Sequence, residues 1–145
     1  MNTFLPYPDI VASAIALDNQ RLGKQRIEAL QIYRVLTGES IAWARHPAVK
    51  MWKGSEAFLL EYYNATVFEW TRRGFKNSMP VYAGYDAPAP EWFGGPIHAN
   101  HRARLIAKNP EFYAKFSWAE SPTDINYYPR TGWYKNGKKL LGVKI

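Results

Sequence analysis

The chain has 145 residues, a formal net charge of +7, 16% aromatic residues and no cysteine. That length suits one domain, the lack of cysteine excludes disulfides and thiol chemistry, and no apolar run reaches the ~18 residues of a membrane span. Positive charge together with stackable rings favours a nucleic acid as partner.

We expect a single domain over residues 1–145. No charged-then-apolar signal segment opens the chain, which favours a cytoplasmic protein. A membrane surface is not an expected partner, because acids and amides interrupt the basic helix faces. We further expect a monomer that needs no cofactor and no obligate protein partner.

The opening segment contains Pro6 and Pro8, which disfavour a helix. It is predicted to be an extended arm lying on the surface. Asp9 can then cap a short apolar stretch over residues 10–17.

Residues 18–38 have the pattern of a long helix, with Asp18 as N-cap and Gly38 as the stop. The predicted core side holds Leu22, Ala29, Leu30, Tyr33 and Leu36, and the predicted polar side holds Arg21, Lys24, Gln25, Glu28 and Gln31. Glu28 is thus one carboxylate among cations. By helix geometry alone this is either a solvated face with ion pairs or a functional site.

The middle of the chain is predicted as a helical turn ending at Gly54, a helix over residues 55–73, and a long ordered loop over residues 76–96. Arg72 and Arg73 complement the dipole at the end of that helix. The loop is rich in proline and aromatic residues, including Tyr85. Its rings either cover the core or stack on bases.

A further helix restarts near Ile97 and places His101, Arg104 and Lys108 on one basic stripe. His98, His101 and His46 could be imagined as zinc ligands, but no cysteine or carboxylate completes the set, so no metal is expected. A last helix begins at the Asn109–Pro110 pair and runs to about residue 118.

The tail over residues 130–145 contains five basic residues, no acid, and a Trp-Tyr pair beside an Asn-Gly turn. Cations that bind phosphate and rings that stack on bases occur together in nucleic-acid-binding segments. The alternative is a solvated basic terminus with Trp133 folded back on the core.

Four collinear segments resemble the pyrimidine-dimer DNA glycosylases, which are compact, mainly helical enzymes. Asp18, Arg21-Leu22 and Glu28 are similar to the family's Asp, His-Leu and Glu on its central helix, with one residue gapped. The other three are RRGF at 72–75, ARLIAK at 103–108 and RTGWYKNGK at 130–138. Each motif is short, but four in the same order are hard to obtain by chance.

The resemblance implies that an N-terminal α-amine attacks C1′ of a damaged nucleotide. The base leaves, an imine to the sugar forms, and β-elimination cuts the strand. Glu28 falls on the family's catalytic glutamate. The amine would belong to Met1 or to Asn2, or stay unused, because Asn2 follows Met1 where the family has a Thr, and a side chain of that size usually blocks removal of methionine.

Several positions are expected to contact DNA. Arg21 replaces the family's histidine, and Arg26 is a candidate stand-in for an arginine that is Ile27 here. The full set is Arg21, Lys24, Gln25, Arg26, His101, Arg104, Lys108, Trp133, Tyr134, Lys135 and Lys138.

We therefore expect a mainly α, single-domain bundle of about three to five helices with long aromatic and proline-rich loops. The expected function is excision of a damaged or modified pyrimidine, including cyclobutane dimers, from double-stranded DNA, with AP-lyase cleavage. The alternative is a non-catalytic nucleic-acid-binding module of the same fold.

Overall fold

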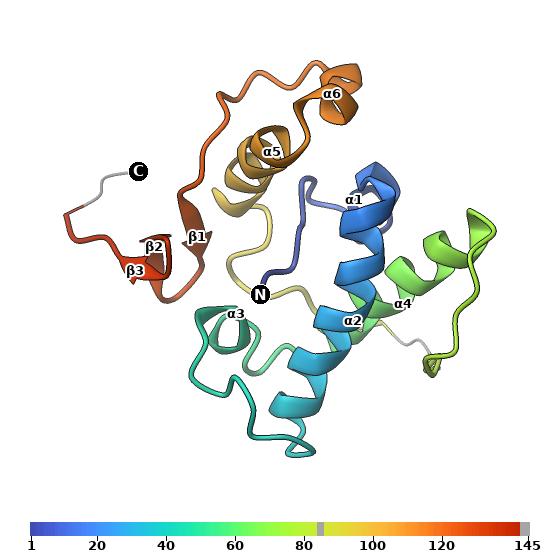
Figure 1. Ribbon diagram of the computed structural model, residues 1–145. Helices are drawn as coiled ribbons and strands as arrows, with labels where there is room; N and C mark the ends of the chain where they lie inside the picture. The colour runs from blue at the N-terminus through green and yellow to red at the C-terminus, as the bar shows by residue number, and fades with distance from the viewer. Residues whose placement is uncertain (84–85, 143–145) are drawn as a thin grey trace.

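The computed structural model describes residues 1–83 and 86–142, and this part of the chain is mainly helical (Figure 1). Tyr85 and the last three residues of the tail lie outside the described residues. The helices are α1 (Ile10–Ala16), α2 (Asn19–Leu36), α3 (Pro47–Lys50), α4 (Glu56–Arg72), α5 (Ile97–Lys108) and α6 (Pro110–Tyr113), followed by a 3-10 turn at Ala114–Phe116. The mainly α fold class is confirmed.

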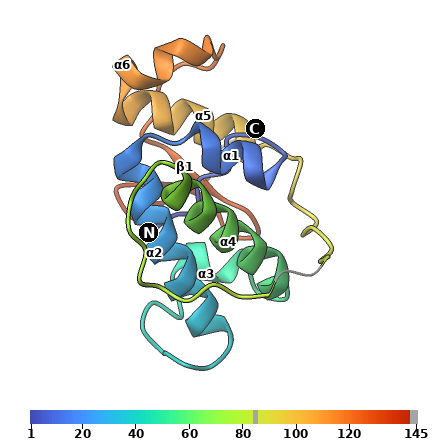
Figure 2. The ribbon, with the colours of Figure 1, turned by 90° about the vertical axis from the view of Figure 1, so that its right-hand side faces the viewer.

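Figure 2 shows α6 and α5 at one end of the molecule, the C-terminal end of α2 and the loop that follows it at the other, and α1, α4 and α3 between them. Most of the core lies between α2 and α4. Trp52, Tyr62 and Tyr63 are fully buried in the larger apolar cluster. No helix within the described residues is both long and apolar enough to cross a bilayer.

Local sequence signals set most helix boundaries. The carboxylate of Asp9 accepts a hydrogen bond from Ala12 N at 2.8 Å, as expected of an N-cap. α2 begins directly after Asp18 and is followed by Gly38, whose φ of +85° favours glycine. α6 is shorter than predicted. It ends at Tyr113 because the chain turns through Ser117, at φ +53°, and stacks aromatic rings over Tyr113.

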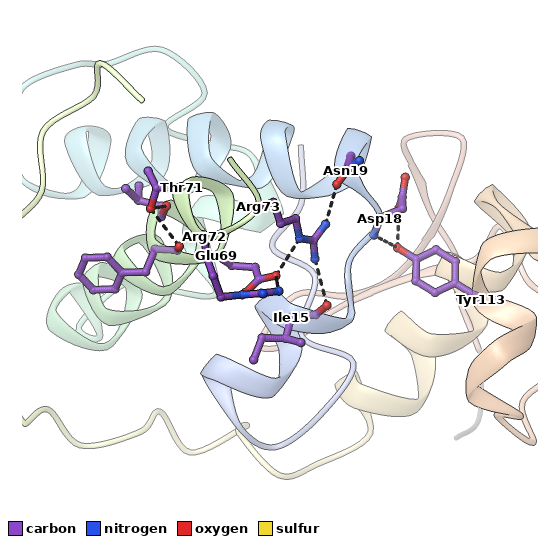
Figure 3. A network of polar contacts seen from close by, with 10 residues as sticks. Ile15, Asp18, Asn19, Glu69, Thr71, Arg72, Arg73 and Tyr113 are labelled. Atoms are coloured by element: carbon purple, nitrogen blue, oxygen red, sulfur yellow. Dashed lines mark hydrogen bonds and ion pairs between the residues drawn. The ribbon is translucent and has the colours of Figure 1, made fainter. Parts of the chain in front are cut away.

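The C-terminus of α4 is tied to the junction between α1 and α2 (Figure 3). Glu69 is buried and accepts hydrogen bonds from Arg72 at 2.6 Å and from Arg73 at 2.8 Å. Arg73 also donates to Asn19 Oδ1 at 2.9 Å and to Ile15 O at 3.0 Å. Arg73 therefore joins three helices, whereas Arg72 bonds Glu69 within α4.

Asp18 joins α2 to α6. Its side chain makes no capping bond. Instead Tyr113 Oη donates to Asp18 Oδ1 at 2.5 Å and accepts from Asp18 N at 3.0 Å (Figure 3). The first turn of α2 is thus held by a tertiary contact.

The tail forms a small antiparallel sheet that the sequence did not predict. Strands β1 (Asn126–Tyr128), β2 (Gly132–Lys135) and β3 (Lys138–Lys139) pair in that order. The Asn136–Gly137 turn joins β2 to β3, and both turn residues have positive φ, as in a tight hairpin turn.

The expectation of a surface arm at the N-terminus is wrong. Residues 2–6 are buried, and Figure 1 shows this segment running beside α5 toward α1. Pro6 and Pro8 disfavour a helix here, but they do not determine whether the segment is buried or exposed. The arm is buried because side chains of the surrounding helices accept and donate its main-chain hydrogen bonds.

Candidate active site

The centre of the site is a contact between the start of the chain and the middle of α2. Asn2 N donates to Glu28 Oε2 at 3.0 Å. Asn2 is buried, whereas Glu28 is half-buried and remains open to a ligand. The Asn2 nitrogen is the atom that becomes the α-amine if Met1 is removed.

A cavity of about 530 Å³ lies beside this contact. Two of its wall residues bind the start of the chain: Tyr128 donates to Met1 O at 3.0 Å, and Asn126 accepts from the Asn2 side chain at 3.5 Å. The lining comes from five parts of the fold: His46 and Pro47, Arg104, Ala107 and Lys108 of α5, Thr123 and Asp124, Asn126 and Tyr128 of β1, and Tyr134, Asn136 and Gly137 of the hairpin. The cavity is large enough for a nucleotide-sized ligand.

Cations gather at the same place. Burial lowers the pKa of the Lys108 ammonium. Nearby charges add to this effect: three cations lower the pKa further and one carboxylate raises it, namely Arg104, Arg21, Lys24 and Glu28. These side chains are therefore close enough to interact electrostatically, and both α2 and α5 contribute cations to this region.

Arg104 has buried guanidinium nitrogens with no partner among the described residues, Nε and Nη1. Its guanidinium lies 5.3 Å from the centre of the Phe4 ring, and burial lowers its pKa. Unused donors on a buried cation are costly, and an anion in the cavity would satisfy them.

Comparison with protein families matches residues 1–83 to the family described as pyrimidine dimer DNA glycosylase. The chain belongs to this family. No curated protein and no solved structure matches the chain. The matched residues include Asn2 and Glu28, whereas Arg104 and Lys108 are C-terminal to them.

Membership of the pyrimidine dimer DNA glycosylase family gives the chain a glycosylase-type function on DNA at the level of the family. Arg21 and Lys24 of α2 lie near Lys108 of α5. Arg21 also pairs with Asp18 at 3.4 Å, which holds its guanidinium at the start of α2.

The expected surface role of His101 and Gln25 is wrong. His101 is 0% and Gln25 1% exposed, so neither side chain can reach a DNA strand from where it lies. His101 Nδ1 accepts from Leu5 N, and Gln25 contacts the main chain of Asn2 and Phe4. Helical periodicity placed both residues on a polar face. It cannot predict that the N-terminal arm, which belongs to no helix or strand, covers them.

Arg26 faces another part of the molecule. It donates to Asn77 Oδ1 at 2.6 Å and lies 4.9 Å from the centre of the Trp70 ring. Its role as a stand-in beside the lesion stays a prediction. The side chain stabilises the segment that follows α4.

The tail contributes to the site in part. Tyr134 lines the cavity, and Trp133 packs on Tyr127 with ring centres 4.6 Å apart. Lys135 lies 3.9 Å from Asp124, and Lys138 is exposed. Trp133 is half-exposed and belongs to neither apolar cluster, so both alternatives for the tail stay predictions.

Sequence reasoning missed His46, Tyr128 and Asn126 as site residues. His46 was considered only as a metal ligand, yet its ring packs against Tyr128 at 5.6 Å on the cavity wall. Burial lowers its pKa, and the charge of the chain's N-terminus lowers it further. None of the three lies on a periodic face, so no local pattern marks them.

Proposed function

We propose that this protein is a DNA base-excision glycosylase for damaged or modified pyrimidines, including cyclobutane pyrimidine dimers, and that it also cleaves the strand as an AP lyase. The observation that carries the proposal is the 3.0 Å contact between Asn2 N and Glu28 Oε2. The start of the chain is also bound by Asn126 and Tyr128, which line a cavity together with Arg104 and Lys108. Double-stranded DNA is the substrate, bound by the protein as a monomer.

The chemistry begins with a free α-amine at the start of the arm. An α-amine has an ordinary pKa near ~8 and so keeps a reactive neutral fraction at cellular pH. Its lone pair forms a bond to C1′ while the bond from C1′ to the base breaks, and the base leaves with the electron pair. The side chain of Glu28 stabilises the positive charge that develops on the sugar and accepts the amine proton.

The sugar ring then opens: the C1′–O4′ bond breaks as the C1′–N bond becomes an iminium, and O4′ takes up the proton that Glu28 accepted from the amine. Loss of a proton from C2′ eliminates the 3′ phosphate and cuts the strand. A neutral His46 on the cavity wall is suited to accept a proton in these steps.

Two amines could supply the nucleophile. Removal of Met1 turns the Asn2 nitrogen, which already contacts Glu28, into the amine. If Met1 is retained, the Met1 amine is the nucleophile, and its charge acts on His46. The position of the Asn2 nitrogen supports Asn2, whereas the size of the Asn2 side chain supports retention of Met1.

Borohydride trapping on abasic and ultraviolet-irradiated duplex DNA tests the proposal. The wild-type protein is expected to form a covalent adduct, and Glu28→Gln is expected to lose it. Glu111→Gln is the matched control, because Glu111 is an exposed carboxylate on α6. Mass spectrometry of the trapped N-terminal peptide identifies Met1 or Asn2 as the attached residue.

The competing function is a non-catalytic nucleic-acid-binding module. While Met1 is present, the Asn2 nitrogen that contacts Glu28 is part of a peptide bond and is not a nucleophile, which favours the module. DNA binding with no trapping and no cleavage by the wild-type protein would refute the enzyme and support the module. Base release without an adduct would instead indicate a glycosylase that lacks lyase activity.

A further inference from the structure

The arm at residues 2–5 is buried but belongs to no helix or strand. Buried main-chain groups need hydrogen-bond partners, and here side chains supply them. Glu28 binds Asn2 N, Gln25 binds Asn2 O and Phe4 N, Tyr62 binds Phe4 O, and two histidines bind Leu5 N and O. Burying this many polar side chains costs desolvation free energy. Their arrangement around the arm therefore points to a role in addition to packing.

The side-chain amide of Gln25 bonds the main chain of the arm with both its donor and its acceptor, as a peptide group of a paired strand would. Its Nε2 donates to Asn2 O at 2.9 Å, and its Oε1 accepts from Phe4 N at 2.6 Å. The same Nε2 lies 3.4 Å from Glu28 Oε2. One amide thus contacts both partners of the reactive pair, Asn2 and Glu28.

Tyr62 fixes that amide. Its hydroxyl lies 2.5 Å from Gln25 Oε1 and 2.7 Å from Phe4 O. Tyr62 is fully buried on α4, and burial raises the pKa of its hydroxyl, so the proton that it donates is retained. The orientation of the Gln25 amide is therefore set from a second helix.

We propose that Gln25 and Tyr62 form a positioning pair that holds the nitrogen of residue 2 against Glu28. This inference rests on the proposed function, since it assigns the pair a task in the attack by the α-amine. Neither side chain touches DNA. The pair acts by keeping the nucleophile in reach of C1′, and a displacement of about 1 Å can cost about 100-fold in rate.

Tyr62→Phe tests the pair, because it removes one oxygen and keeps the ring. Tyr63→Phe is the matched control. Tyr63 is the next residue of α4, is also fully buried, and donates to Pro80 O, away from the arm. A loss of stability alone would affect both variants, whereas the positioning role belongs to Tyr62.

The measurements are the rate of borohydride trapping at saturating abasic duplex, the dissociation constant for that duplex, and the melting temperature. Tyr62→Phe is expected to trap about 10-fold to 100-fold more slowly with an unchanged dissociation constant. Tyr63→Phe is expected to trap at the wild-type rate. All rates are measured below the melting temperature of the least stable variant.

Gln25→Met is the second variant, should Tyr62→Phe fail to fold. It keeps the length of the side chain and removes both hydrogen bonds to the arm, and the same slow trapping with unchanged binding is expected. Wild-type trapping rates in Tyr62→Phe and Gln25→Met, or equal losses in Tyr62→Phe and Tyr63→Phe, would overturn the positioning role while leaving the proposed function standing. If the wild-type protein itself traps no DNA, the proposed function fails.

Discussion

At the scale of single residues, Lys108 is a candidate for a contact that contributes to DNA binding and not to the proposed chemistry. Lys108 is exposed and lines the cavity together with Arg104. The charges of Arg104 and Glu28 both act on its ammonium. Its position suits a phosphate of the strand that flanks the lesion.

Lys108→Ala is expected to weaken duplex binding for every sequence alike and to lower the slope of log K against log salt by about 1. Fluorescence anisotropy over a range of salt concentrations measures this. Lys76→Ala is the control, because Lys76 is equally exposed but follows α4, at the Trp70 side of the molecule. Equal slopes in the two variants would contradict a phosphate contact at Lys108.

The two arm-binding histidines make stability depend on pH. His101 Nδ1 accepts from Leu5 N. His98 Nδ1 donates to Leu5 O while its Nε2 accepts from Gly94 N, so each ring keeps one nitrogen without a proton and both rings are neutral in the fold. Burial lowers the pKa of each below 6.5, most strongly for His101. The unfolded chain therefore binds protons first as the pH falls, and a proton on His101 Nδ1 would oppose the Leu5 donor.

The contribution of these histidines to the free energy of unfolding is thus fully present above 6.5, the pKa of histidine in the unfolded chain. Below that pH the free energy of unfolding declines by up to about 1.4 kcal/mol per pH unit for each histidine that stays neutral in the fold. Urea denaturation between pH 7 and pH 5 should show the decline. This window lies above the range in which Glu69 and Glu120, whose pKa values are lowered, begin to titrate. A flat profile that is the same in His101→Gln would refute the prediction.

At the scale of elements, α2 and α4 approach closely at Gly23. A Cβ at this position would lie 3.0 Å from Cζ3 of Trp70. The ring cannot easily retreat, because it stacks on Phe75 with centres 4.2 Å apart and Arg26 lies against it. Trp70 Nε1 also donates to Lys76 O.

Gly23→Ala is therefore expected to destabilise the fold by about 1 kcal/mol, because a clash of about 1–3 kcal/mol exceeds the gain of about 1 kcal/mol in helix propensity. The free energy of unfolding in urea measures the difference. If Gly23→Ala is as stable as the wild type or more so, the Trp70 ring moves freely and the close approach does not constrain α2.

The junction of α1, α2 and α4 depends on one buried carboxylate. Glu69 accepts from both arginines at the end of α4, and Arg73 carries the connection to Asn19 and Ile15 (Figure 3). Replacing Glu69 leaves these donors without their charged acceptor.

Glu69→Gln is expected to lower the free energy of unfolding by about 1.5–3 kcal/mol, the range for a hydrogen bond to a charged group. Glu111→Gln, on the exposed face of α6, should change it little. The comparison is made by chemical denaturation. Equal stability of the two variants would mean that Arg73 holds the junction without Glu69.

At the scale of the whole molecule, the net charge of +7 gains meaning from where the cations lie. α2 and α5 bring Arg21, Lys24, Arg104 and Lys108 to one region, although the two helices are distant in sequence. The hairpin, which lines the cavity through Tyr134, carries Lys135 and Lys138. The candidates for phosphate contact are Arg21, Lys24, Arg104, Lys108, Lys135 and Lys138.

If these six cations all contact phosphates, log K for duplex binding should fall against log salt with a slope of about −5, at about −0.9 for each contact. Titrations of a lesion-free duplex from low to physiological salt measure the slope. A slope shallower than about −2 would contradict a duplex-binding surface of this extent and would favour a small-molecule ligand.

The sequence by itself determined the local features of this protein. Asp9, Gly38 and the Asn109–Pro110 pair mark helix ends because caps and stops act through bonds to adjacent residues. Four short motifs in order were enough to suggest the family and to single out Glu28. These signals are readable because each depends on residues that are close together in the chain.

Only the tertiary structure decided what surrounds Glu28. The burial of the arm, the internal positions of Gln25 and His101, and the cavity walls at His46 and Tyr128 all arise from contacts between distant segments. A helical period assigns Gln25 to a polar face and cannot reveal that the arm covers it. Hydrogen bonding explains the difference, because a polar side chain becomes a core residue once a buried main chain needs its donor and acceptor.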